Sequence, residues 1–158
     1  MFRFFRQIAP SRKGARERAL DALEAGDYRQ AEALISALLE GAVSADDRAF
    51  LLNKRGVARI GLRLRDDACA DFAAALECQA NFAPALSNLG NLLLEEGRVD
   101  DAIVHYEAAI EADPEYARAY VNLAAAQKRA GRYDDAVRAL RRGHRLEGQA
   151  AARPRKRL

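Results

Sequence analysis

The chain has 158 residues, half of them hydrophobic and 31% charged, with a net charge of +3 at pH 7. This length suits one domain, and the sequence has no run of about 18 apolar residues that would predict a transmembrane helix. Residues 1–18 and 148–158 are both basic, whereas the sequence between them is acidic. Basic ends favour acidic proteins, anionic lipid or nucleic acid as partners without selecting among them.

Residues 1–13 form a basic segment that is rich in phenylalanine, beginning MFRFFRQIAP. Its apolar part is too short and too charged for a secretory signal peptide. On a helix, Phe2, Phe5 and Ile8 would share one face. We expect the segment to pack on its own chain, to dock on a partner subunit, or to lie in a membrane interface with its arginines on phosphate. The residues expected to dock are Phe2, Arg3, Phe4, Phe5, Arg6 and Ile8.

The sequence pattern of residues 83–116 repeats along the chain at a spacing of about 34 residues. A repeat of this length is the main sequence evidence for the fold class. Moved forward by this spacing, the run GRVDDA at 97–102 falls on GRYDDA at 131–136. Moved back, Gly90 falls on Gly56. A glycine at this position predicts that two paired helices approach closely there, since a side chain would push them apart.

The pattern L-x-x-L-G, then G-x-x-x-x-A, an aromatic residue, a small residue and Asp-Pro resembles the tetratricopeptide repeat. The aromatic position holds Phe72 and Tyr106, and Asp113-Pro114 ends one helix because proline cannot donate the backbone hydrogen bond. The resemblance covers most of the chain. It implies an all-α, right-handed solenoid of helix–turn–helix hairpins whose concave face holds peptides or partner proteins. The fold itself does not choose among the many roles that it hosts.

Four hairpins are predicted within a repeat domain of residues 14–147, followed by a basic tail. The hairpins span about 15–40, 48–78, 83–112 and 117–146, and the tail spans 148–158. The first hairpin is degenerate, because Arg18 and Ala19 stand where the pattern has Leu and Gly; terminal repeats are commonly atypical. Asp46 or Asp47 is expected to cap the first helix of the second hairpin.

The last predicted helix differs from the earlier second helices. His144 occupies an apolar position of the repeat, and arginines border a thin apolar seam. We interpret this helix as the end of the stack, exposed to water without a further helix over it. The bordering arginines are Arg138, Arg141, Arg142 and Arg145.

By the resemblance, the first helix of each hairpin lines the concave groove. Asparagine amides there can donate and accept hydrogen bonds together, which suits a peptide backbone. Basic side chains outnumber Glu95 in this set, so an acidic peptide is the expected guest. The alternative is that these side chains only keep the groove hydrated. The predicted groove residues are Asn53, Lys54, Asn88, Asn91, Arg118, Asn122, Lys128 and Arg129.

A more specific hypothesis fails on the sequence. Some members of the family grip the carboxylate terminus of heat-shock chaperones with a clamp of Lys, Asn, Asn, Lys and Arg across three repeats. The corresponding positions here match only at Asn88, with Arg118 as a conservative replacement, and Val57 cannot hydrogen-bond through its side chain. The sequence therefore disfavours this clamp.

Catalysis is not expected. His105 and His144 fall on second helices without the partners of a known triad, and no glycine-rich phosphate loop is present. Cys69 and Cys78 are nine residues apart on one predicted helix, a spacing that fits neither a zinc site nor a disulfide between them. We expect no metal and no cofactor. Nucleic acid is disfavoured as a partner, because no lattice of aromatic and basic residues accompanies the basic ends.

The sequence thus predicts a non-enzymatic protein-binding module of a bacterial cytoplasm, acting through the concave groove on an acidic protein or peptide. The alternative is a structural or assembly subunit of a larger complex, docked by the segment 1–13 and peripheral to a membrane. Removing residues 1–10 separates the two, because only the second depends on them.

Overall fold

The structure is a computed structural model that describes residues 12–152, and all its regular elements in this range are α-helices. The helices are α1 Arg12–Glu24, α2 Tyr28–Leu39, α3 Ala45–Gly61, α4 Arg65–Cys78, α5 Ala83–Glu95, α6 Val99–Ala112, α7 Ala117–Arg129 and α8 Tyr133–Ala152. The predicted docking residues Phe2 to Ile8 lie outside the described residues. None of the helices between residues 12 and 152 is long and apolar enough to cross a membrane.

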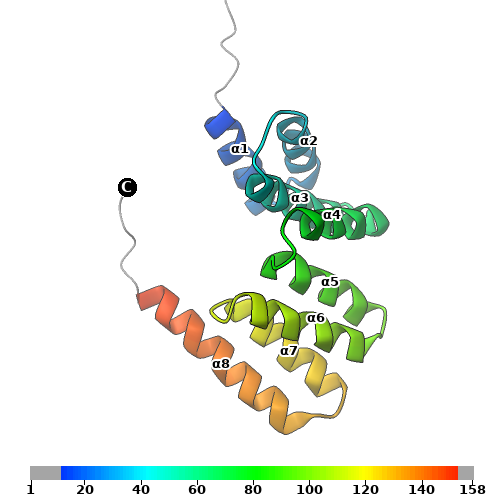
Figure 1. Cartoon of the computed structure of the whole chain (residues 1–158), viewed down its shortest axis with the longest axis vertical. Coiled ribbons are helices and arrows are strands. Elements are labelled where there is room, and N and C mark those ends of the chain that lie inside the picture. Colours follow the sequence, from blue (N-terminus) through cyan, green and yellow to red (C-terminus); the bar gives the residue numbers. More distant parts are fainter. Residues whose placement is uncertain (1–11, 153–158) are drawn as a thin grey trace, which may run out of the picture.

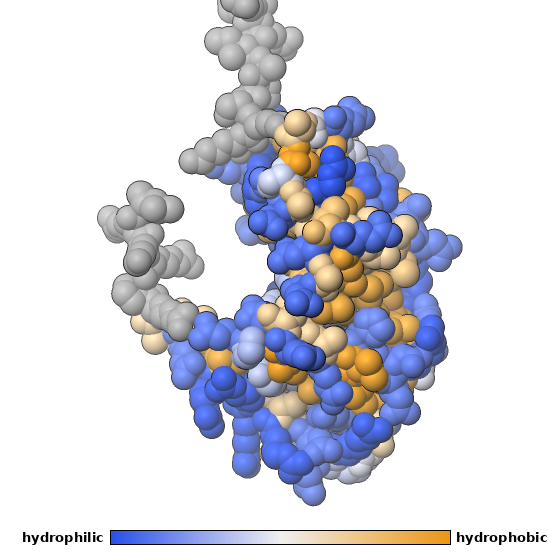
Figure 2. Space-filling view, viewed as in Figure 1, coloured by the Kyte–Doolittle hydropathy of each residue, from blue (hydrophilic) through white to orange (hydrophobic). Residues whose placement is uncertain are grey.

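The helices pair in chain order, and the pairs stack along the long axis of the molecule (Figure 1). Each of α3, α5 and α7 also packs against the second helix of the preceding pair, and α5 contacts α7. Figure 2 shows hydrophobic residues along the middle of one face with hydrophilic residues around them, and an outline hollowed between α1 and the end of α8. This arrangement confirms the predicted all-α solenoid.

Glycine and an aromatic ring fit against each other inside two of the hairpins. A Cβ atom on Gly56 would lie 2.5 Å from the Phe72 ring, and one on Gly90 would lie 2.6 Å from the Tyr106 ring. Both rings are fully buried. The close approach predicted at Gly56 is confirmed, and it explains why the glycine and the aromatic residue recur together.

The start of α3 differs from the prediction, which placed the cap at Asp46 or Asp47. The cap is Ser44: its Oγ accepts a hydrogen bond from the Asp47 backbone N–H at 3.1 Å and donates one to the Asp47 carboxylate at 3.0 Å. Hydrogen bonds from Arg16 and then Ser44 lower the pKa of Asp47. The reciprocal pair satisfies a free N–H of the first turn, so the helix begins at Ala45.

The last helix is longer than predicted. It continues to Ala152, whereas the sequence placed the start of a tail at Gly148. The added residues are Gly148 followed by a glutamine and three alanines, and these last four have high helix propensity. Propensity extends the helix here without burial, because residues 147–152 are all exposed.

Candidate functional site

The predicted groove asparagines are hydrogen-bonded to one another across α3, α5 and α7. Asn88 Nδ2 donates to Asn53 Oδ1 at 2.8 Å. Asn122 Nδ2 donates to Asn91 Oδ1 at 3.0 Å and to Ser87 Oγ at 3.2 Å. We call these five residues the asparagine ladder. It joins three successive first helices through side chains that are 31 to 35 residues apart in the chain.

The ladder is tied to the core by Tyr106, whose hydroxyl donates to Asn91 Oδ1 at 2.8 Å. Burial raises the pKa of Tyr106 to about 12, so the phenol stays protonated and keeps donating. Asn53 and Ser87 are themselves buried. Much of the ladder's hydrogen-bonding capacity therefore holds helices together, a structural role that the sequence did not predict for these asparagines.

Part of that capacity is left over. Among residues 12–152, no hydrogen bond engages Asn91 Nδ2 or the Oδ1 atoms of Asn88 and Asn122. A small cavity of about 130 Å³ adjoins Asn88 and Asn91 between α3 and α5. Its lining includes Asn88 and Asn91 from the predicted set, together with Val57, Ile60 and Glu95. The cavity thus combines apolar wall with amide groups at its edge.

The predicted basic residues fall into two groups, on α3 and on α7. Lys54 Nζ lies 5.4 Å from the centroid of the Phe50 ring, and Arg16 Cζ lies 4.4 Å from the same centroid. On α7, Arg118 and Lys128 are exposed. Arg129, also on α7, donates to the backbone oxygen of Leu94 at 2.9 Å. Between the two groups, on α5, the charge of Glu95 is balanced by Arg65 at 2.5 Å. Positively charged side chains therefore stand on α3 and on α7, with the paired Glu95 on α5 between them.

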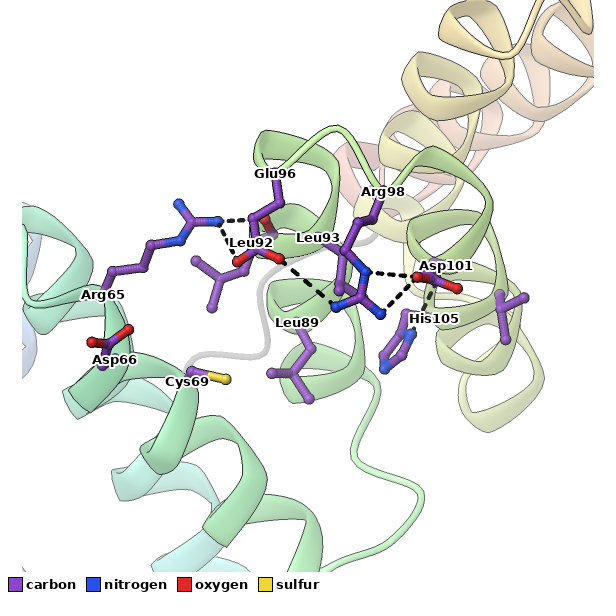
Figure 3. A pocket seen from close by; sticks show the side chains of 11 residues that line it. Arg65, Asp66, Cys69, Leu89, Leu92, Leu93, Glu96, Arg98, Asp101 and His105 are labelled. Carbon is purple, nitrogen blue, oxygen red and sulfur yellow. Dashed lines mark hydrogen bonds and ion pairs between the residues drawn. The ribbon is translucent and has the colours of Figure 1, made fainter.

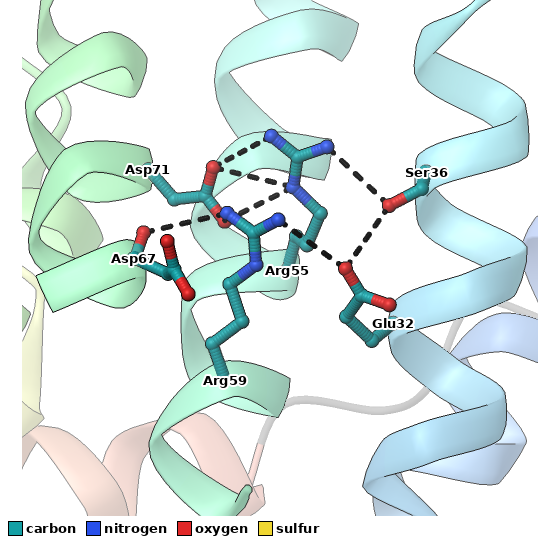
Figure 4. A network of polar contacts seen from close by, with 6 residues as sticks. All are labelled: Glu32, Ser36, Arg55, Arg59, Asp67 and Asp71. Carbon is teal, nitrogen blue, oxygen red and sulfur yellow. Dashed lines mark hydrogen bonds and ion pairs between the residues drawn. The ribbon is translucent and has the colours of Figure 1, made fainter. Parts of the chain in front are cut away.

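A second polar cluster, which the sequence analysis missed, lies where α3 meets α2 and α4 (Figure 4). Asp71 on α4 is 3% exposed, and its carboxylate accepts from Arg55 Nη2 at 2.7 Å and from Arg59 Nη1 at 2.9 Å. Arg59 also reaches Glu32 at 3.3 Å, and Arg55 reaches Ser36 Oγ at 3.3 Å. We call this cluster the ion network. Its charges are matched within the molecule, which indicates a structural role.

A signal for the ion network was present in the repeat pattern. Arg55 directly precedes Gly56, at the position that Leu89 holds before Gly90 in the next hairpin. A charged residue in place of a repeated leucine needs a partner when it is partly buried. The pattern could have predicted that Arg55 is paired, but not that its partner is Asp71.

A pocket of about 370 Å³ lies where α4, α5 and α6 meet (Figure 3). Leu89, Leu92 and Leu93 supply apolar lining from α5, and Val104 supplies it from α6. The Cys69 side chain points from α4 towards Leu89. We call this the junction pocket. Its charged lining residues are Arg65, Asp66, Glu96, Arg98 and Asp101.

Several of the polar groups that line the junction pocket have partners within the chain. Cys69 and Cys78 are both free on α4. No group of three or more His, Cys, Asp or Glu side chains within residues 12–152 could hold a metal ion. The two arginines of the junction pocket already form ion pairs. Arg65 pairs with Glu95 and Glu96, and Arg98 pairs with Asp101.

Comparison with known proteins supports the repeat and the fold. The tetratricopeptide repeat family matches residues 93–153. The crystal structure of MamA superposes with a TM-score of 0.69 at 20% identity, covering 90% of this chain and 82% of that chain. MamA from Desulfovibrio magneticus RS-1 gives 0.66 at 21% identity, with 89% and 77% covered.

A further similar structure is YrrB, described as a tetratricopeptide repeat protein with an unusual peptide-binding site. Its TM-score is 0.62 at 20% identity, with 87% of this chain and 70% of that chain covered. At such identities the likeness shows the fold alone. A search of curated proteins finds no match to the sequence.

Proposed function

We propose that this chain, which belongs to the tetratricopeptide repeat family, binds an acidic peptide of a partner protein in the groove formed by α3, α5 and α7. The family and fold make it a protein–protein interaction module. The observation that carries the peptide proposal is the cavity beside the asparagine ladder, whose lining joins Asn88 and Asn91 to the apolar Val57 and Ile60.

The groove offers three kinds of contact to an extended peptide. Asn91 Nδ2 can donate to a peptide carbonyl, and the Oδ1 atoms of Asn88 and Asn122 can accept from peptide N–H groups. The cavity of about 130 Å³ admits one small aliphatic side chain. Lys54 on α3 and Arg118 with Lys128 on α7 attract carboxylates of the guest. YrrB, which has the same fold and a described peptide-binding site, supports this use of the surface.

The test is fluorescence anisotropy with labelled extended peptides that carry alternating Asp/Glu and small aliphatic residues. Reversing two exposed groove charges, in the double variant R118E/K128E, should weaken binding by about tenfold or more because it repels the guest. These side chains make no ion pair within residues 12–152, so the fold should survive. Asn88 and Asn122 are unsuitable targets, since their loss would also disturb the ladder.

The matched control is R29E, which reverses an exposed charge on α2, a second helix. It should leave peptide affinity within about twofold, since distant surface charges are screened. R29E changes the net charge by −2 and the double variant by −4. A loss of binding free energy in R29E of half that in R118E/K128E, or more, would mean that net charge, and not the groove, governs binding. Unchanged affinity in the double variant would contradict the proposal directly.

The alternative function, a structural or assembly subunit docked by residues 1–13, rests on the phenylalanines of that segment, which lie outside the described residues. Comparing partners captured by the full chain and by a chain without residues 1–10 tests it. Loss of a stable multisubunit complex on deletion would favour the docking function. An unchanged set of partners would favour the groove.

A further inference from the structure

Helix α8 carries an exposed apolar stripe. Tyr133 is 65% exposed, Val137 is 48% exposed and Leu140 is 38% exposed. Spacings of four and three residues place these side chains on one side of the helix. The adjoining side of α8 is buried in the core through Ala136, Ala139, Gly143 and Leu146. We call the first set the α8 stripe.

The same position is covered where another helix follows. Ile103 comes directly after the buried Ala102 on α6, as Val137 comes directly after the buried Ala136 on α8. Ile103 is only 3% exposed, because it packs in one cluster with residues of α7 such as Leu123. Val137, in the middle of the α8 stripe, therefore stands at the position that a following helix covers on α6. The shape that fits it is a helix.

Charge restricts the chemistry of that helix. Arg141 and Arg145 follow Val137 at spacings of four and eight residues, so they border one edge of the α8 stripe. Both are exposed, and no ion pair within residues 12–152 engages them. Asp134 is the acidic residue on the same edge. A helix lying on the stripe would set its own flank against these arginines, and carboxylates there would be stabilised.

The charge also argues against this chain's own segments as the occupant. Residues 1–18 carry six basic side chains and one acidic side chain, and residues 148–158 are basic as well. Either segment would meet the arginines of α8 with charge of the same sign. A second copy that stacked its amino-terminal end on α8 would bring the same basic segment to the interface.

We propose that the outer face of α8 binds an acidic amphipathic helix of a partner protein. Its apolar side packs on Tyr133, Val137 and Leu140 as α7 packs on α6, and its carboxylates face Arg141 and Arg145. This surface is separate from the groove of α3, α5 and α7. The proposal therefore does not depend on peptide binding there.

Two synthetic helical peptides of equal length test the proposal. Both carry leucines at the i, i+3, i+4, i+7 spacing, and their flanks hold glutamate in one and lysine in the other. Titrated into the full-length ¹⁵N-labelled protein, the glutamate peptide should shift backbone resonances between Tyr133 and Arg145. The lysine peptide should bind about tenfold more weakly or worse. The double variant R141E/R145E should reverse this preference.

Val137→Glu should lower the affinity for the glutamate peptide by about tenfold or more, because it places a like charge in the apolar contact. Val137 is already half exposed, so this variant should fold. The matched control is Val104→Glu, at a valine that is 60% exposed on α6; it should leave binding unchanged. Equal effects of the two variants would overturn the proposal, as would resonance shifts confined to α3, α5 and α7.

The same protein and variants would also reveal a different occupant of the α8 stripe. Concentration-dependent dimerisation that Val137→Glu abolishes would assign the face to a second copy. Movement of the α8 resonances on removal of residues 1–11 would assign it to the chain's own amino-terminal segment. Either result would overturn the proposal of a partner helix.

Discussion

The junctions between successive hairpins can be compared at one equivalent position of the second helix. The residue that follows the buried alanine of each second helix is Glu32 on α2, Cys69 on α4 and Ile103 on α6. Glu32 pairs with Arg59 of the next helix at 3.3 Å. Cys69 lines the open junction pocket, whereas Ile103 is buried among apolar residues of α7. One framework thus accepts an ion pair, an opening or an apolar contact at the same place.

The first-helix side and the second-helix side of a junction differ in how much they vary between hairpins. On the side of the asparagine ladder, the second and third junctions are alike, since Asn88 bonds to Asn53 and Asn122 bonds to Ser87, both across 35 residues. On the side of the second helices they are not. We infer that the ladder sets the alignment of the first helices, which leaves the other side free to vary.

Removing the buried charge should have the largest effect. In D71N, Arg55 and Arg59 lose the carboxylate that both of them contact at 2.7 and 2.9 Å. Partly buried guanidinium groups left without their anion destabilise a protein strongly. We expect the free energy of unfolding to fall by about 3 kcal/mol, measured by urea denaturation at pH 7.

The neighbouring D66N is the control for D71N, because Asp66 is exposed in the first turn of the same helix. It should cost less than about 1 kcal/mol, the effect of a carboxylate on the helix dipole. Equal losses in the two variants would show that the ion network does not stabilise the junction.

The second largest destabilisation is expected when the apolar contact between α6 and α7 is replaced by the residue found at the open junction of α4 and α5. Ile103→Cys removes aliphatic carbons from a position that is 3% exposed. Truncation of a buried isoleucine costs about 2 kcal/mol when the site does not collapse. We expect that loss in thermal or urea unfolding. A cost near zero would mean that α7 closes over the gap left by the isoleucine. The small side chain of Cys69 would then not be what keeps the junction pocket open at the equivalent position.

Replacing Tyr106 by Phe tests the tie between core and ladder. The variant loses the hydrogen bond to Asn91 Oδ1, worth about 1 kcal/mol at pH 7. Because the pKa of Tyr106 is raised to about 12 in the folded state, its protonated form stabilises the fold fully below about pH 10, the pKa of an unperturbed tyrosine. The advantage of wild type over Y106F should shrink as the pH rises from about 10 to 12. A constant difference across that range would contradict the assignment.

The smallest effect is expected from filling the junction pocket. Cys69→Ile places at α4 the residue that packs at α6. Cavity-filling changes typically stabilise by about 0.5–1 kcal/mol, and the variant should also lower the exposure of Leu89. Hydrogen exchange of α5 would show this as slower exchange of its amides. Destabilisation would instead indicate that α4 and α5 approach too closely for the added carbons.

Several features of this protein follow from the sequence itself. The recurrence of Gly56 with Phe72 and of Gly90 with Tyr106 determined which helices pair and how closely, because only glycine leaves room for the ring. The repeat pattern predicted the ends of the helices less well than their pairing. Ser44 and residues 149–152 were readable as a cap and as helix formers, but both lay outside the repeat pattern that set the expected boundaries.

The tertiary structure alone decided how polar side chains are used. The sequence placed Asn53, Asn88 and Asn122 on first helices, and their pairing depends on helices that are 31 to 35 residues apart in the chain coming within hydrogen-bonding distance. Asp71 carries no local mark of its burial, since it meets Arg55 and Arg59 only after α3 and α4 have packed. Period along the chain determines which face of a helix a residue occupies. Whether its polar atoms are satisfied there is settled by the neighbouring helix.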